Sequence, residues 1–301
     1  MLCRSEAILA SVFPQMKNHP ECYPCLLKLA VEMGKIATDD EEIHWKIVQE
    51  TLERIGIVRK DRIPIAVGKE IQAIVRRLAD NPDPYRDIKK EYNRKARELL
   101  PLLEAEIERS DNRFLTALKI IATANIIDVM MFASDRFQFA EFLQARLSSD
   151  FKGDIEPAAL IAAIGNANSI LYVADNCGEI ILDCYFIDRF LTDKKVYLSV
   201  RGGPALNDAT KEDLDGISFH GRVQVMDTGD DSPGVILATS SDTFNKIYNT
   251  VDLVILKGQG NFEGIGVPER DDVYSLFIAK CPMISRHAGC EMNDLVLMRP
   301  R

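Results

Sequence analysis

The hydrophobic pattern of this chain changes once along its length, and the change limits the folds open to it. Up to about residue 165 the apolar residues recur every three or four positions, as on one face of a helix. From Ser169 onward they come in short continuous runs, which are typical of strands buried on both faces of a sheet. These runs lie at 170–174, 196–200, 223–226, 253–256, 274–279 and 295–297. Since helical stretches separate most of them, we expect an α/β fold: a mainly parallel sheet with flanking helices, preceded by an all-helical domain.

The same change predicts a division into two domains. Residues 1–165 are expected to form a helical lid, and residues 166–301 an α/β domain that binds a metal and catalyses a reaction. Trp45, the only tryptophan, is expected in the core of the first domain. The helices are predicted near 26–36, 40–52, 64–78, 85–108, 113–132, 137–147 and 157–164, then near 180–191, 207–214 and 241–248.

Composition narrows the classes of partner. The net charge of −9 argues against a dedicated nucleic-acid binder, which normally presents a basic face. No stretch of about 18 uninterrupted apolar residues is present, so no membrane span is expected. Seven scattered cysteines do not suggest a disulfide framework, so the expected location is the reducing cytoplasm. The oligomeric state is not indicated.

Polar and glycine residues follow each of the first four predicted strands. Ligands of open α/β sheets bind outside the carboxyl ends of the strands, so these residues predict an active-site crevice. They are Asp175 to Glu179, Arg201 to Gly203 with Asn207 and Asp208, Asp227 to Asp231, and Lys257 to Asn261.

Three of these residues are candidate metal ligands that would form the catalytic centre. Asp175 and Asn176 offer a carboxylate and an amide oxygen, and Asp208 offers a second carboxylate. Oxygen ligands with open water positions suit Mg²⁺ or Mn²⁺, and Co²⁺ or Ni²⁺ also fits such a site. The alternative is that Asp175 or Asn176 only caps the helix that begins near Ile180. Glu179 is a candidate base or water positioner.

A second group suits a phosphate. In Lys257-Gly258-Gln259-Gly260-Asn261 the glycines allow backbone N–H groups to approach an anion, and Lys257 neutralises charge. The alternative is a flexible turn with a solvated lysine. Arg201, Asn207 and Asn261 are further candidates for substrate binding, and so is Lys280.

Two features of the helical part also suggest function. Asn125 and Asp128 are polar residues within an apolar helix, so they are expected either to face the crevice and bind substrate or to be hydrogen-bonded within the core. Cys22 and Cys25 form a pair that suits a metal, a redox reaction or simply a helix start.

Taken together, these motifs resemble the metal-dependent damage-control phosphatases, formerly the domain-of-unknown-function 89 family, and in particular the microbial subgroup with an N-terminal paired-Cys motif. The resemblance spans nearly the whole chain. It rests on Cys22-Tyr23-Pro24-Cys25, Asp83-Pro84-Tyr85, Asn125-Ile126-Ile127-Asp128, Asp175-Asn176-Cys177-Gly178-Glu179, Asn207-Asp208 and Lys257-Gly258-Gln259-Gly260-Asn261-Phe262-Glu263.

The resemblance implies a role for several residues. It implies that Asp175, Asn176 and Asp208 hold a divalent metal and that Lys257 contacts phosphate. It also implies hydrolysis of small phosphate esters, such as sugar phosphates, nucleotides or damaged metabolites. The Arg-Thr-x-Lys motif of some members corresponds here to 277–280, where only Lys280 is kept.

Three other functions remain open at this stage. A methyltransferase would use the turn after the first strand for a nucleoside, but that turn lacks the expected further glycines. A haloacid-dehalogenase-type phosphatase needs two aspartates spaced by one residue, and Asp175 is followed by Asn176, Cys177 and Gly178. The third alternative is a non-catalytic, metal-gated sensor of a phosphorylated metabolite.

Overall fold

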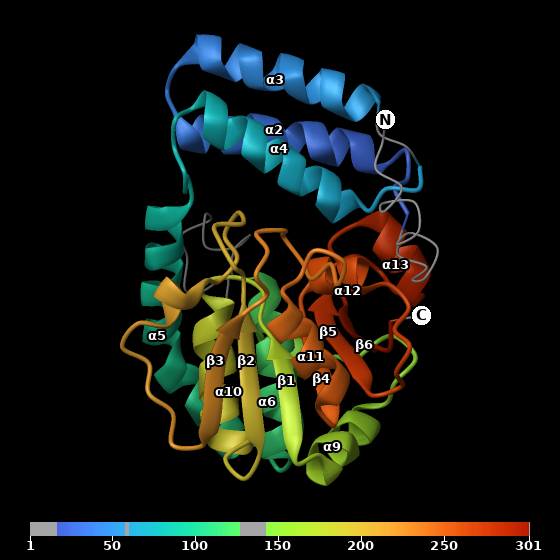
Figure 1. Ribbon diagram of the computed structural model, residues 1–301. Helices are drawn as coiled ribbons and strands as arrows, with labels where there is room; N and C mark the ends of the chain where they lie inside the picture. Colours follow the sequence, from blue (N-terminus) through green and yellow to red (C-terminus); the bar gives the residue numbers. More distant parts are fainter. Residues whose placement is uncertain (1–16, 58–59, 127–142, 301) are drawn as a thin grey trace.

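A computed structural model describes residues 17–57, 60–126 and 143–300 (Figure 1). Its centre is a six-stranded sheet, as predicted. The strands are β1 (Ser169–Val173), β2 (Lys195–Val200), β3 (Arg222–Asp227), β4 (Leu253–Lys257), β5 (Val273–Ile278) and β6 (Leu295–Met298). Their spatial order is β3-β2-β1-β4-β5-β6, and only β6 runs antiparallel to its neighbour. The prediction of a mainly parallel sheet is therefore confirmed.

This strand order creates a point at which a ligand site is expected. The chain moves from β1 outward through β2 to β3, then returns to the other side of β1 and continues through β4 and β5. The connections after β1 and β4 therefore leave in opposite directions and open a crevice between the two strand ends.

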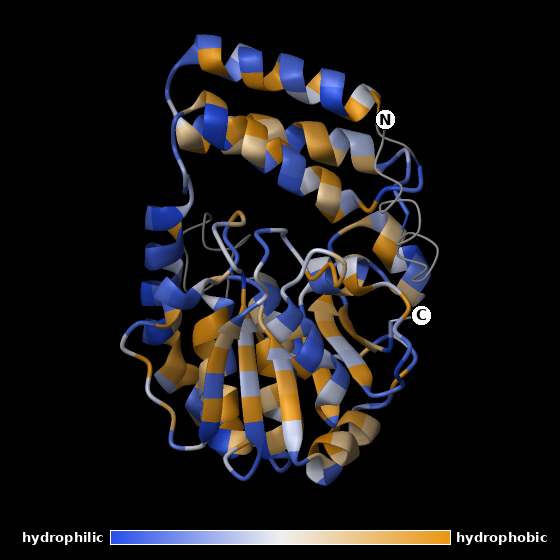
Figure 2. Ribbon diagram, viewed as in Figure 1, coloured by the Kyte–Doolittle hydropathy of each residue, from blue (hydrophilic) through white to orange (hydrophobic). Residues whose placement is uncertain are grey.

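Helices cover both faces of the sheet. From residue 86 onward the helices include α5 (Arg86–Arg109), α6 (Arg113–Thr123), α9 (Pro157–Asn166), α10 (Glu179–Phe190), α11 (Asp242–Thr250), α12 (Gln259–Ile265) and α13 (Pro282–Ala288). Side chains alternate along each strand, so Ile170 and Tyr172 pack with α5, α6, α9 and α10, whereas Leu171 and Val173 pack with α11. Figure 2 shows the resulting apolar bands on the strands and on the helix sides that face them.

Three N-terminal helices form a separate layer, which we call the cap: α2 (Cys22–Ala37), α3 (Glu41–Gly56) and α4 (Pro64–Leu78). They share a small core of their own, which includes Met33, Ile47 and Ile71. Figure 1 shows the cap lying across the end of the sheet. By contrast, α5, α6 and α9 share the core of the sheet. The predicted domain division at residue 165 stays a prediction.

Three details differ from expectation. Trp45 is 65% exposed rather than buried, because α3 turns Ile47, Thr51 and Ile55 inward, and position 45 lies on the opposite side of that helix. The helix expected over 207–214 is only a 3-10 turn at Lys211–Leu214. In the helix expected over 113–132, the α-helix ends at Thr123 and a 3-10 turn follows over Ala124–Ile126, while 127–132 lie outside the described residues. The helix predicted for 137–147 lies mostly outside the described residues, although 143–147 are helical.

Candidate functional site

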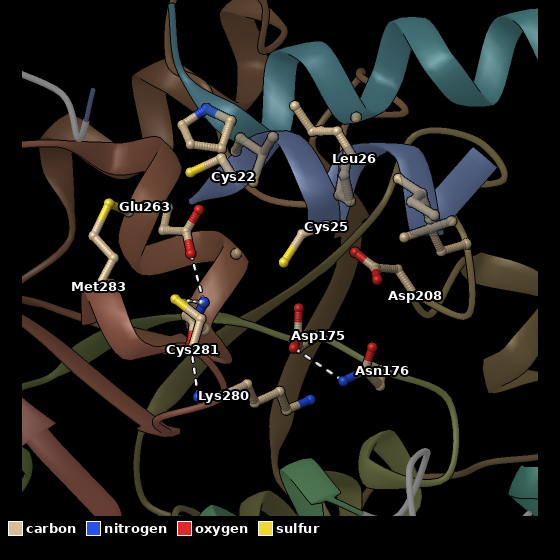
Figure 3. Close-up of a pocket in the computed structure, with 18 of the residues that line it drawn as sticks. Cys22, Cys25, Leu26, Asp175, Asn176, Asp208, Glu263, Lys280, Cys281 and Met283 are labelled. Atoms are coloured by element: carbon tan, nitrogen blue, oxygen red, sulfur yellow. Dashed lines mark hydrogen bonds between the residues drawn. The ribbon is translucent and has the colours of Figure 1, made fainter. Parts of the chain in front are cut away.

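A cavity of about 380 Å³ lies between the cap and the carboxyl end of the sheet (Figure 3). Five of the predicted site residues line it: Asp175, Asn176, Asn207, Asp208 and Lys280. The cap contributes residues of α2 and α4 to the opposite wall. The cavity therefore opens at the switch point, where ligand binding is expected from the strand order alone.

Asp208 lies beside Asp175 because two segments pair as a short β-bridge. Asn176 and Asp208 form an isolated antiparallel bridge. The backbone N–H of Cys177 donates to the carbonyl of Asn207 at 2.8 Å, and that of Ala209 donates to the carbonyl of Asp175 at 2.8 Å. This extended pairing replaces the predicted helix and fixes the two aspartates on the same edge.

The carboxylate of Asp175 is held from three sides. The side-chain amide of Asn125 donates to its Oδ2 at 2.9 Å, and the guanidinium of Arg201 donates to its Oδ1 at 3.2 Å. On the third side lies Gly258, where a Cβ atom would stand 1.8 Å from Oδ2. Arg201 also donates through Nε to Asp208 Oδ2 at 2.5 Å, so one buried cation joins the two aspartates.

This electrostatic setting suits a cation. Burial raises the pKa of Asp175 well above its usual value, and the charges of Asp208 and Glu179 raise it further, while Arg201 and Lys280 oppose the shift. Burial likewise raises the pKa of Asp208 against the effect of Arg201. A divalent ion would offset the crowding of negative charge, and two carboxylates with one amide fit the oxygen set of Mg²⁺ or Mn²⁺. No group of three or more His, Cys, Asp or Glu side chains within the described ranges is arranged to hold a metal.

Lys257 lies behind this edge and not in the lining of the cavity. Its ammonium group is fully buried and donates to Glu179 Oε1 at 2.7 Å, to Asp183 Oδ1 at 2.6 Å and to the carbonyl of Ile121 at 3.0 Å. Glu179 is fully buried too, and it accepts a hydrogen bond from Asn125 at 2.8 Å. The candidate phosphate contact and the candidate base are therefore paired with each other beneath Asp175.

Two members of this buried network were missed in the sequence. Asp183 accepts hydrogen bonds from Lys257 and from the hydroxyl of Tyr172 at 2.6 Å, and burial raises its pKa to about 7 although Lys257 opposes the shift. An aspartate within the apolar run of α10 and a tyrosine within a buried strand were the available signals, since buried polar groups require partners.

Of the remaining predicted residues, Asn261 is buried behind the cavity and Lys280 lines it. Asn261 is buried and donates to the carbonyls of Ala174 at 3.1 Å and Lys257 at 2.6 Å. Figure 3 shows the side chain of Lys280 directed toward Asp175 and Asn176. Asp128 lies outside the described residues.

Another part of the cavity wall carries sulfur and a further carboxylate. Cys22 and Cys25 come from α2, Glu263 from α12, and Cys281 from the residue before α13. All three cysteines are free thiols. Burial and the nearby charge of Glu263 raise the pKa of Cys22 and of Cys281, so both thiols are neutral at pH 7. The role of the Cys22–Cys25 pair stays open.

The cap is tied to the loops after β2 and β3 by ion pairs. Lys69 of α4 pairs with Asp230 and with Asp231, the latter at 2.9 Å. Arg76 of α4 donates to Asp231 at 2.7 Å and to the carbonyl of Pro204 at 2.6 Å. Asp230 and Asp231, which we expected in the crevice, thus form ion pairs with the cap instead.

Known proteins resemble this chain over nearly its whole length. The family model for the damage-control phosphatase ARMT1-like domain matches residues 18–296. Relatives include an uncharacterized protein of Methanocaldococcus jannaschii, 29% identical over 94% of this chain and 96% of its own length. A damage-control phosphatase of Pyrococcus horikoshii is 28% identical over 94% of this chain and 98% of its own length. The crystal structure of a DUF89 family protein from that organism superposes with a TM-score of 0.84 at 28% identity, covering 95% of this chain and all of the other.

Proposed function

Because this chain belongs to the damage-control phosphatase ARMT1-like domain family, we propose that it is a metal-dependent phosphatase that hydrolyses small phosphate monoesters. The observation that supports the proposal most is the convergence of Asp175, Asn176, Asp208 and Lys280 on one cavity at the switch point of the sheet. That set combines oxygen ligands for a divalent ion with a cation for a phosphate, which a helix cap alone does not require.

We assign the metal to Asp175, Asn176 and Asp208, with Mg²⁺, Mn²⁺, Co²⁺ or Ni²⁺ as candidates. When bound, such an ion supplies Lewis-acid stabilisation for phosphoryl transfer to water. Lys280 would bind the phosphate and offset the charge that develops on it, and Asn207 would contact the same group from the adjacent loop.

The buried residues would act by positioning. Arg201 and Asn125 fix both oxygens of Asp175, and Asn261 in turn fixes Arg201 by accepting a hydrogen bond at 2.9 Å. Lys257 and Glu179 support Asn125 from below. We therefore place Lys257 and Glu179 among the positioning residues, and we propose Lys280 as the lysine that touches phosphate.

The cap would limit the size of the substrate. A cavity of about 380 Å³ suits a small metabolite and excludes a macromolecule from the edge of the sheet. None of the helices in the described ranges is long and apolar enough to span a membrane. The expected cytoplasmic location stays a prediction, and the free thiols of the six described cysteines favour it.

A phosphate-release assay tests the proposal. Protein stripped with a chelator and reloaded with each candidate metal is mixed with p-nitrophenyl phosphate and a panel of small phosphate monoesters. We expect activity that requires a metal and falls at least about 100-fold in Asp175→Asn and in Asp208→Asn. Asp242→Asn, an exposed carboxylate at the start of α11, is the matched control and should keep full activity. Equal activity in all three variants, or activity without any metal, would refute the proposal.

A further inference from the structure

Glu263 is a buried carboxylate that the proposed hydrolysis does not use. Its side chain lines the same cavity as Asp175 and Asp208, and the residue is only 7% exposed. Figure 3 shows Glu263 and Asp208 at opposite sides of the pocket. Glu263 is therefore placed to meet the part of a substrate that extends away from the phosphate.

The position of this carboxylate is fixed by a neutral partner. The amide nitrogen of Gln259 donates to Glu263 Oε1 at 2.6 Å. Gln259 cannot readily turn, because its own oxygen accepts from the backbone N–H of Lys280 at 2.8 Å. An ionised carboxylate has about four acceptor positions, so this one bond from the described part of the chain leaves most of the capacity of Glu263 unused.

No cation balances the charge of Glu263 among the described residues. Burial raises its pKa to about 7, and the hydrogen bond from Gln259 is the opposing influence. The titratable groups that face it are the thiols of Cys22 and Cys281, whose pKa values it raises. A buried carboxylate without a positive partner is unfavourable, and a cationic ligand relieves that penalty.

The other residues of the cavity also favour a cationic group beside Glu263. Lys280 is the one Lys or Arg that lines the cavity within the described ranges, and its side chain is directed toward Asp175. The lining of the cavity is mostly apolar and includes Leu26, Leu29 and Ile65. A second anionic group near Glu263 would be repelled, whereas a positively charged donor would be attracted.

We propose that Glu263 is a specificity-determining residue that binds an ammonium group on the alcohol portion of the substrate, so that the site takes phosphate monoesters of amino alcohols. The proposal rests on the proposed phosphatase function and names its substrate class. The substrate would lie with its phosphate at Lys280 and the proposed metal, its carbon chain along the apolar wall, and its ammonium group at Glu263.

Matched substrates test this directly. Phosphate release by the Mn²⁺-loaded enzyme is measured with alkyl phosphates of two to six carbons that end in ammonium, hydroxyl, methyl or carboxylate. At the best chain length, we expect kcat/KM for the ammonium series to exceed that for the hydroxyl series about 10- to 100-fold, with the carboxylate series lowest. Hydroxyl or carboxylate substrates equal to or better than ammonium substrates would overturn the inference.

Variants test whether Glu263 causes the preference for ammonium substrates. Glu263→Gln keeps the shape and removes the charge, so it should abolish the preference, mainly through a rise in KM for the ammonium series. Glu269→Gln, an exposed residue just beyond α12, is the control and should keep the preference. If Glu263→Gln does not fold, Glu263→Asp replaces it, and a partial loss of preference is expected. An intact preference in the folded variant would refute the assignment.

The pH dependence adds a second readout. The ammonium-to-hydroxyl ratio should fall as the pH drops below about 7, because protonation removes the charge of Glu263. The ratio cancels effects of pH on the metal and on the phosphate, which both series share. Absence of phosphate release from p-nitrophenyl phosphate would instead refute the underlying phosphatase function. Release without an ammonium preference would refute only the role of Glu263.

Discussion

Replacing Gly258 by alanine should disable the site while changing stability only modestly. Gly258 has φ of +80°, and a Cβ there would lie 1.8 Å from Asp175 Oδ2, whereas ordinary contacts begin near 3.4 Å. The carboxylate must therefore move by roughly 1.5 Å, and a displacement of about 1 Å at a reacting centre costs on the order of 100-fold in rate. We expect Gly258→Ala to lose at least about 100-fold in kcat/KM.

Gly216 provides the matched control. Its φ is +78°, and a Cβ there would meet nothing within 4 Å. Gly258, with ψ of 154°, lies in a region essentially restricted to glycine. Both substitutions should therefore cost about 1–3 kcal/mol for the positive-φ backbone, which corresponds to a fall in Tm of about 2–12 °C. Only Gly258→Ala should also lose activity. Phosphate release and thermal unfolding are measured on the same preparations of both variants to separate loss of activity from loss of stability. If Gly258→Ala keeps activity within about threefold of Gly216→Ala, the placement of Asp175 is wrong.

Two further predictions concern the surroundings of the site. Lys257→Met leaves Glu179 and Asp183 buried without their cation, so it should lower the free energy of unfolding by about 3–5 kcal/mol in a denaturant titration; a loss well below 1 kcal/mol would contradict the buried network. For Asp231 burial opposes ionisation, but its salt bridges with α4 outweigh that effect and lower its pKa. Its stabilising contribution is therefore present above the usual pKa of 3.8 and lost as the pH falls through the depressed folded value. The difference in Tm between wild type and Asp231→Asn should therefore become smaller as the pH is lowered. A difference independent of pH would refute the role of Asp231 in holding the cap.

The sheet was predictable because its signal is local. Buried strands such as β1 and β4 show as continuous apolar runs, and the polar residues that follow them mark the carboxyl edge without any knowledge of strand order. The resemblance of the ordered motifs to a known family was shown by the match over residues 18–296. The prediction of a helix over 207–214 was wrong because the pairing of Asp208 with Asn176 is a contact between distant segments, which no local pattern encodes.

The residues of the candidate site could be predicted, but not which of them line the cavity and which are buried behind it. Lys257 and Lys280 were both predicted to contact phosphate, because a sequence shows which residues are charged but not which of them are buried. In the structure Lys257 is fully buried with two carboxylates, while Lys280 lines the cavity. Glu263 was part of a recognised motif, yet its place opposite Asp208 depends on how α12 and the loop after β2 lie at the carboxyl edge of the sheet.

The proposed hydrolysis depends on a divalent metal ion held by Asp175, Asn176 and Asp208. Diffraction from crystals soaked in Mn²⁺, recorded with anomalous scattering from manganese, tests it most directly. We expect one strong anomalous peak at the carboxyl edge of β1, within about 2.0–2.6 Å of oxygen atoms of these three side chains, and its loss in Asp208→Asn. A peak at Cys22 and Cys25 instead, or no peak at this edge in a protein that releases phosphate, would contradict it.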